Sequence, residues 1–460
     1  MPHETPLIAT IVAGLGLAFI FGALANRFKI PPLVGYLLAG VLVGPHTPGF
    51  VADQHLALEL AEIGVILLMF GVGLHFSLKD LLSVRAIAVP GAVVQIGFAT
   101  VLGAGLAWML GWSIGAGLVF GLALSVASTV VLLRALQERR MIDTERGRIA
   151  VGWLIVEDLA MVLALVLLPA LAGVLGGQTS PGEEREAQQL LSLQFDLGVW
   201  GVIGITLLKV AAFVAFMLII GRRVIPWILH YVAHTGSREL FRLSVLAIAL
   251  GVAFGAASLF GVSLALGAFF AGMVMSESEL SHQAAEESLP LRDAFSVLFF
   301  VSVGMLFDPR SLFSETWPIL ATLFITVIGK SVAAFLIVVA FRYPVGTALI
   351  ISASLAQIGE FSFILAELGV SLNLLPEQGR DLILAGAILA GNFCSSHGFA
   401  RPTAQKATGL SRMDRMAPAR IRSRPCSGRR FRLTPSSARM KENSPICARL
   451  AEMISAVPTG

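Results

Sequence analysis

Residues 151–162, VGWLIVEDLAMV, form an apolar stretch with two adjacent carboxylates at its centre. If the helix begins just after Arg148, a rise of ~1.5 Å per residue puts Asp158 about 15 Å along it, near the middle of a ~30 Å hydrocarbon layer. An ionisable group is costly there and usually marks a path for ions or protons. We expect Asp158 to be the principal binding carboxylate and Glu157, which points ~100° away, to modulate it.

The composition around this stretch is that of a membrane protein, with 56% apolar residues, 13% charged residues and a mean hydropathy of +0.83. Apolar runs divided by polar, Gly or Pro residues predict about thirteen helices, the last of them too short to span. Their expected ranges are 7–26, 31–49, 58–76, 87–110, 114–135, 149–175, 197–221, 240–259, 262–275, 293–307, 317–341, 345–369 and 382–391.

Loops rich in lysine and arginine alternate along the chain with loops that have few of them. The loops on one side carry fifteen of them, and those on the other side carry three: Arg185, Arg310 and Arg380. Because positive loops stay in the cytoplasm, the N-terminus is predicted outside and the C-terminus inside.

Lys330 is a second ionisable residue at mid-membrane depth, twelve residues before Arg342 and therefore ~18 Å along its helix from that end. A buried ammonium needs a carboxylate nearby or must lose its proton. Opposite charges at matched depth favour a functional pair. A purely structural ion pair that holds the helices together is the alternative.

Two helices, 114–135 and 345–369, have polar centres and align with each other. Small residues match at an offset of 229 positions: Gly117, Ser125 and Ala127 with Gly346, Ser354 and Ala356. The two helices enter from opposite sides, as inverted repeats require, and broken helices of this kind can coordinate a cation. Ordinary small-residue packing is the alternative. The polar candidates are Ser125, Ser128, Thr129, Ser354, Gln357 and Glu360.

Residues 276–290 form a predicted cytoplasmic loop that is acidic where the other cytoplasmic loops are basic. It is either a regulatory surface or a solvated linker. Its candidate regulatory residues are Glu277, Glu279, His282, Glu286 and Glu287.

Together these features resemble the Kef-type branch of the monovalent cation:proton antiporters. The resemblance covers about residues 1–390 and rests on residues 32–40, 64–78, 125–133, 152–163, 265–273, 298–305, 329–331 and 356–363. It implies an all-α polytopic membrane protein of about 12–13 helices, with inverted repeats and two crossing broken helices as in sodium/proton antiporters. A core domain would move against a dimerisation domain in the bacterial inner membrane.

The resemblance also assigns roles. The aspartate matching Asp158 binds proton and cation in turn, Lys330 is its charge partner, and the segment 276–290 is where relatives are gated. We therefore expect a dimeric secondary transporter that exchanges a monovalent cation for protons, with K⁺ the first expectation and Na⁺ the alternative, and with a cytosolic regulatory protein as a further partner. Catalytic residues, a metal site and a bound cofactor are not expected.

Three alternatives remain. A gated cation channel would share the buried charges without alternating access. A truncated product would insert without activity. An enzyme using Glu157 and Asp158 as an acid/base pair is disfavoured because adjacent helical carboxylates diverge.

The chain changes character near residue 391. We expect residues 1–391 to be the transport domain, with an incomplete last helix, and 392–460 to be a basic tail where relatives continue into a dinucleotide-binding domain. From 401 onward eleven Arg, two Lys and three acidic residues give a net +10, whereas the whole chain carries +4. A frameshift near codon 391 explains the change; a genuine tail at the anionic cytoplasmic leaflet is the alternative. No folded nucleic-acid-binding module is recognised there.

Overall fold

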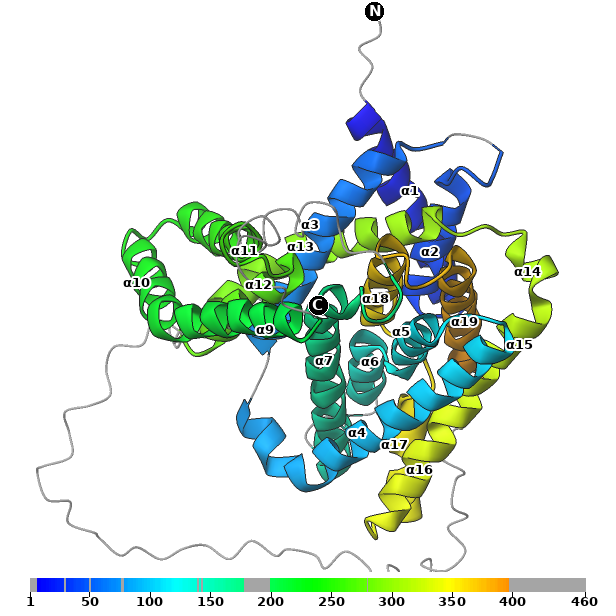
Figure 1. Ribbon diagram of the computed structural model, residues 1–460. Helices are drawn as coiled ribbons and strands as arrows, with labels where there is room; N and C mark the ends of the chain where they lie inside the picture. Colours follow the sequence, from blue (N-terminus) through cyan, green and yellow to red (C-terminus); the bar gives the residue numbers. More distant parts are fainter. Residues whose placement is uncertain are drawn as a thin grey trace, which may run out of the picture. The chain divides into compact units, whose positions relative to one another are not determined.

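The computed structural model describes residues 6–28, 30–48, 51–75, 78–138, 140–141, 144–177, 199–278 and 280–396. Every regular element in these ranges is a helix (Figure 1). The helices are α1 (Pro6–Arg27), α2 (Pro32–Val43), α3 (Gln54–His75), α4 (Leu78–Met109), α5 (Ile114–Ser125), α6 (Thr129–Glu138), α7 (Glu145–Leu171), α9 (Val199–Phe216), η1 (Met217–Gly221), α10 (Arg222–Ala233), α11 (Arg238–Phe260), α12 (Leu264–Ser276), α13 (Ser281–Met305), α14 (Ser311–Ser314), α15 (Thr316–Phe324), η2 (Ile325–Gly329), α16 (Lys330–Ala340), α17 (Val345–Ser354), α18 (Glu360–Ser371) and α19 (Glu377–Ser396).

Seven of the described helices are long and apolar enough to cross a membrane. They are α1, α3, α4, α7, α11, α13 and the continuous rod α15–η2–α16, in which η2 is a π-helical turn. Four shorter apolar helices, α2, α5, α12 and α17, pack among them. The chain is therefore a multi-pass membrane protein whose shorter helices bury part of their surface against other helices.

Helix starts are set by side-chain caps. The hydroxyls of Ser113, Thr144, Ser237 and Ser263 each accept a hydrogen bond from the amide three residues on, at the starts of α5, α7, α11 and α12. Such caps satisfy amides that the helix itself leaves free. Gly261, with φ +63°, ends α11 in the left-handed conformation that glycine adopts without strain.

The helix contacts repeat along the chain, as two inverted repeats require. α1 packs on α2 as α11 packs on α12, and α12 packs on α3 as α2 packs on α13. In the same way α4 contacts α5 and α7, while α16 contacts α17 and α15 contacts α19. Helices α1–α3 and α11–α13 thus make one layer, and α4–α7 and α15–α19 make the other (Figure 1).

Glycines let the helices of the first layer approach closely. A side chain at Gly73 would overlap the carbonyl oxygen of Phe269, and one at Gly272 would overlap that of Phe70. The two glycines lie on opposite sides of the same α3–α12 contact. Close backbone approach of this kind is how helices pack when lipid gives no hydrophobic driving force.

Some predicted boundaries were wrong. The helix expected at 293–307 begins at Ser281, so most of the acidic segment is helix rather than loop. The last helix, expected at 382–391, is longer than predicted and runs from Glu377 to Ser396, although it is not among the seven helices long and apolar enough to span. Both errors arise because an apolar run marks only the lipid-like part of a helix, whereas polar helix formers such as Glu and Gln extend it.

Candidate ion-binding site

The two predicted broken helices are present and cross. α5 ends at Ser125 and α6 begins at Thr129, while α17 ends at Ser354 and α18 begins at Glu360. The two breaks touch, because a Cβ atom on Gly359 would lie only 2.5 Å from the carbonyl oxygen of Ala127. Unwound backbone therefore meets unwound backbone beside α7, leaving carbonyl and amide groups free to take other partners.

α7 brings the two predicted carboxylates to the first break. Glu157 is fully buried and Asp158 is 5% exposed. Oε2 of Glu157 accepts a hydrogen bond from the Ala127 amide at 3.0 Å, and Oδ2 of Asp158 accepts one from the Thr129 hydroxyl at 3.1 Å. Oε1 of Glu157 and Oδ1 of Asp158 are buried without a hydrogen-bond partner in the described part of the chain. Glu157 therefore holds the unwound backbone, and Asp158 faces the start of α6.

Lys330 is fully buried at the same crossing. Its Nζ donates to the carbonyl oxygens of Val126 at 2.8 Å and Gln357 at 2.7 Å, with Leu124 at 3.4 Å. A cation is favoured at the C-terminal carbonyls of a helix, which here are those of α5. Its charge also acts on Glu157. Lys330 thus binds both breaks; its role as charge partner of the ion site stays a prediction.

The second break supplies further polar groups. The side-chain amide of Gln357 donates to the carbonyl oxygens of Ser128 at 3.2 Å and Ser354 at 3.0 Å. The Ser128 hydroxyl lies 3.5 Å from Oε2 of Glu360, which opens α18, where the helix dipole favours a carboxylate. The charge of Glu360 acts on Asp158. The candidates Ser128, Thr129, Ser354, Gln357 and Glu360 are thus brought together.

Ser125 belongs to the same network, but its hydroxyl is satisfied within its own helix by Leu122. Its carbonyl oxygen accepts a hydrogen bond at 3.0 Å from Gln95 of α4, a residue that sequence reasoning missed. Gln95 is fully buried and in turn accepts one from Trp153 of α7 at 3.4 Å. A glutamine in the middle of the apolar run 87–110 was the signal that could have revealed it.

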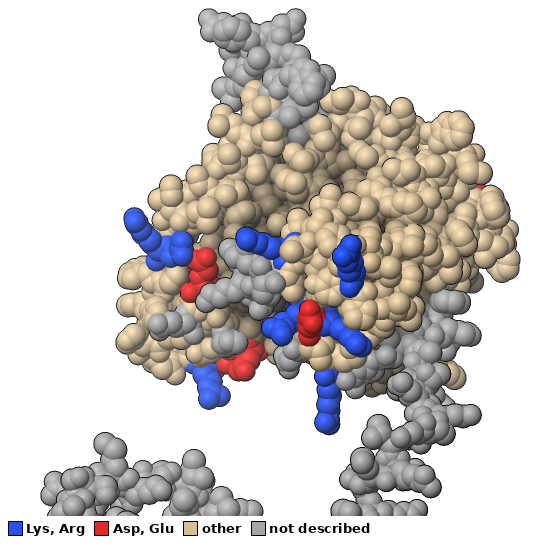
Figure 2. All heavy atoms as spheres, turned by 90° about the horizontal axis from the view of Figure 1, so that it is seen from below, with Lys and Arg blue, Asp and Glu red and all other residues tan. Residues whose placement is uncertain are grey.

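Candidate residues of the acidic segment pair with arginines of neighbouring helices. Glu277 pairs with Arg222 at 2.7 Å, and Glu287 on α13 pairs with Arg242 on α11. Glu286 lies on α13, Glu279 lies outside the described residues, and of His282 only its place in α13 is described. Figure 2 shows acidic side chains among the basic ones on the face seen from below. The acidic segment is therefore tied to neighbouring helices by ion pairs.

The sequence and the architecture of this chain are similar to those of known proteins. The model of the family described as sodium/hydrogen exchanger, transmembrane, matches residues 15–393. YbaL of Escherichia coli (strain K12), named as a candidate cation/proton antiporter, is 65% identical over 85% of this chain and 67% of its own length. K(+) efflux antiporter 4 of Arabidopsis thaliana is 34% identical over 84% of this chain and 61% of its own length. The chain therefore spans about two thirds of the length of these relatives.

The solved structure of the sodium proton antiporter MjNhaP1 from Methanocaldococcus jannaschii covers 85% of this chain and 96% of that one, with a TM-score of 0.59 and 16% identity. This likeness confirms the predicted sodium/proton antiporter-like fold. The family match and the identity with YbaL together show that the chain belongs to the sodium/hydrogen exchanger family, a family of cation/proton transporters rather than enzymes.

Proposed function

We propose that this chain exchanges a monovalent cation for protons by alternating access, with Asp158 as the group that binds each in turn. The observation that carries the proposal is Oδ1 of Asp158, which is buried and has no hydrogen-bond partner in the described residues. A buried oxygen of this kind calls for a ligand. Beside it lie the Thr129 hydroxyl and the unwound backbone between α5 and α6.

The chemistry is competition for one carboxylate. A proton or a cation can each neutralise the buried charge of Asp158, and one excludes the other. A monovalent cation would find hard oxygen ligands in the carboxylate, the Thr129 hydroxyl and nearby backbone carbonyls. Glu157 is tied to the Ala127 amide and Lys330 to carbonyls of both breaks. These two residues would keep the breaks in register while Asp158 exchanges its ligand.

Alternating access would come from movement between the two helix layers. The layer with α5, α7 and α18 carries the site, and the layer with α3 and α13 would form the static, dimeric part. The N-terminus would lie outside and the C-terminus in the cytoplasm of a bacterial inner membrane, as the loop charges predict. The cation would be K⁺, in keeping with the K(+) efflux antiporters 4 and 6 of Arabidopsis thaliana, which are 33–34% identical.

Gating by a cytosolic regulatory protein would act at residues 276–290, where Glu277 and Glu287 already pair with arginines. The basic tail beyond residue 396 lies outside the described residues, so its two explanations stay predictions.

The experiment is cation-driven proton movement in proteoliposomes that hold a pH-sensitive dye, with K⁺ and Na⁺ tested separately. Wild-type protein should move protons when a gradient of a cation that it transports is imposed. Asp158→Asn should abolish this proton movement while the protein still inserts into the membrane. Glu59→Gln, which alters a carboxylate with a 63% exposed side chain, is the matched control and should keep wild-type activity. Near-normal exchange in Asp158→Asn would refute the site, and cation flux without proton movement would favour a channel.

A further inference from the structure

Arg380, in the first turn of α19, joins the two helix layers at a hinge. The connection from α13 to α15 carries the chain from the first layer to the second, and Leu306 is the residue that ends α13. The Arg380 guanidinium donates a hydrogen bond to the Leu306 carbonyl oxygen at 3.2 Å. Because α19 belongs to the second layer, this bond spans both layers at the point where the chain passes between them. Arg310 and Arg380 lie on the side that is predicted to be outside.

Two buried carboxylate oxygens lie near the Arg380 guanidinium. Oε2 of Glu367, on α18, is 3.7 Å from it, and Oδ1 of Asp381 is 4.0 Å from it. Both distances are too long for hydrogen bonds, and within the described residues neither oxygen has a hydrogen-bond partner. The side chain of Asp381 is 13% exposed, whereas that of Glu367 is 39% exposed. Asp381 is therefore the more buried of the two, and a proton on its Oδ1 would remove the cost of a buried charge.

Further negative charges act on Asp381. Burial raises the pKa of Asp381 to about 7 against the lowering effect of Arg380, and the charges of Asp308 and Glu377 raise it further. Asp308 lies in the connection after α13, so its repulsion of Asp381 acts between the layers. The other elements that contact α19, namely α2, α5, α14, α15 and η2, have no charged side chains. The remaining charged groups nearby in the chain are Arg310 and Glu315 in the connection and Glu360 and Glu367 on α18.

We propose that Asp381 is a second proton-binding site, separate from Asp158, and that a proton bound there holds the two helix layers together at this hinge. When Asp381 is neutral, its repulsion of Asp308 disappears, while the Arg380 guanidinium stays bound to the Leu306 carbonyl oxygen. When Asp381 is ionised, a buried negative charge lies near Asp308 across the boundary between the layers, and Arg380 offsets only part of its cost. The layers then separate more readily.

The direction of the pH effect follows from linkage. Asp381 takes up a proton more readily in the described arrangement than it would when exposed to water, where an aspartate has a pKa of about 4. Lower pH therefore stabilises the described arrangement, and this stabilisation is lost as the pH rises through about 7. Between pH 8 and pH 6, the ratio of this arrangement to one in which Asp381 is exposed should rise about tenfold.

Movement between the layers is part of the proposed function, and this inference rests on it. A ligand that binds one arrangement better shifts the population toward that arrangement. Acid on the predicted outer side would therefore hold the layers together and slow exchange, whereas alkaline solution would release them. This effect does not depend on which cation the crossing binds.

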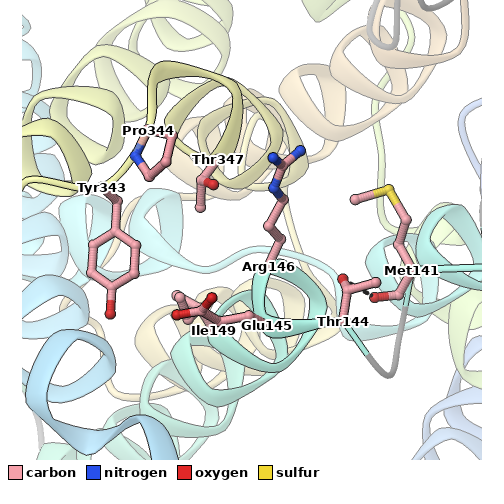
Figure 3. Close-up of a pocket in the computed structure, with 8 residues that line it drawn as sticks. All are labelled: Met141, Thr144, Glu145, Arg146, Ile149, Tyr343, Pro344 and Thr347. Atoms are coloured by element: carbon pink, nitrogen blue, oxygen red, sulfur yellow. Dashed lines mark hydrogen bonds between the residues drawn. The ribbon is translucent and has the colours of Figure 1, made fainter.

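A carboxylate and an arginine at the opposite end of the second layer provide a matched control. Glu145 and Arg146 line a cavity of about 330 Å³ between the starts of α7 and α17, on the predicted cytoplasmic side (Figure 3). The residues that line it belong to these two helices or to the segments directly before them, so none of them lies in the first layer. A change of charge at Glu145 should therefore leave the contact between the layers unaffected.

The test follows the two layers directly, by double electron–electron resonance between two spin labels. One label is attached at Val51→Cys in the first layer and the other at Ile114→Cys in the second; both positions are exposed and lie on the predicted outer side. The three native cysteines, Cys394, Cys426 and Cys447, are first replaced by serine. The full-length protein is measured in nanodiscs from pH 5 to pH 9.

In the labelled protein with Asp381 intact, the ratio of the two distance populations should change about tenfold between pH 8 and pH 6. Asp381→Asn, which imitates the neutral form, should give the pH 6 distribution at both values. Asp308→Asn removes one repelling charge and should move the midpoint of the change to lower pH without abolishing it. Glu145→Gln should respond as the protein without it does.

Distances that do not change with pH when Asp381 is intact, or an unaltered response in Asp381→Asn, would overturn the proposal. If Asp381→Asn fails to fold, an unchanged midpoint in Asp308→Asn overturns it instead. Asp158→Asn should keep the full pH response of the layers although it does not transport. Failure of the proposed cation site is therefore distinguishable from failure of this second proton site.

Discussion

Replacing Lys330 with methionine removes the ammonium at the crossing while nearly preserving the length of the side chain. The carbonyl oxygens of Val126 and Gln357 lose donors at 2.8 and 2.7 Å in a fully buried position. Each unsatisfied buried polar group costs about 1–3 kcal/mol, which predicts a loss of about 2–6 kcal/mol for the two carbonyls. The positive charge that acts on Glu157 is lost as well, which places the expected effect in the upper half of that range.

The assay is chemical unfolding of the detergent-solubilised protein, followed by proton exchange in proteoliposomes for whatever fraction remains folded. Lys209→Met is the matched control, because Lys209 lies in α9 and is exposed. It should change unfolding little. If Lys330→Met unfolds within about 0.5 kcal/mol of wild type, a change typical of surface substitutions, the crossing does not depend on this ammonium. If that variant is stable yet inactive, Lys330 serves transport rather than the fold.

Two further substitutions test the crossing and the site. Gly359→Ala would place a Cβ 2.5 Å from the Ala127 carbonyl oxygen, whereas ordinary contact begins at 3.4 Å, so the breaks must separate. The expected cost is about 1–3 kcal/mol in unfolding, and an unchanged stability would refute the contact; Gly251→Ala, with open space around it, is the control. Thr129→Val removes the hydroxyl that donates a hydrogen bond to Asp158. Its loss should cost about 1 kcal/mol, which predicts a roughly fivefold rise in KM for the cation, whereas Thr129→Ser should behave as wild type. Equal KM values in the two Thr129 variants would contradict a role for this hydroxyl.

The residue pattern predicted the two broken helices because its signal is local, whereas their crossing was implied by the family resemblance. The match of Ser125 with Ser354 at a fixed offset marks the last residue of α5 and the last residue of α17, where each half-helix ends. It could not predict where the chain resumes a helix. Val126 and Leu355 are apolar and look like helix interior, yet they lie where one break packs against the other through Gly359 and Ala127. Tertiary contact therefore decides what local propensity leaves open.

The partners of the buried charges were harder to predict. Their positions along their helices predicted the same membrane depth for Asp158 and Lys330, and the structure places both at the crossing. Asp158 accepts a hydrogen bond from a hydroxyl and Lys330 donates to backbone carbonyls, and no residue pattern encodes partners of these kinds. Gln95 was overlooked because a single amide does not interrupt an apolar run, yet it is fully buried beside Ser125.

The π-helical turn η2 (Ile325–Gly329) directly precedes Lys330 and amounts to one extra residue inside an α-helix. Deleting one of these five residues would remove the extra residue, so that the turn closes into regular α-helix while α15 and α16 keep their faces toward α19 and α17. A deletion elsewhere in the rod would instead rotate one half by ~100° relative to the other, and either α15 would lose its fit to α19 or the Lys330 ammonium would turn away from its carbonyls. The π-helical turn is therefore the place in this rod where the chain can change its length by one residue without rebuilding the crossing.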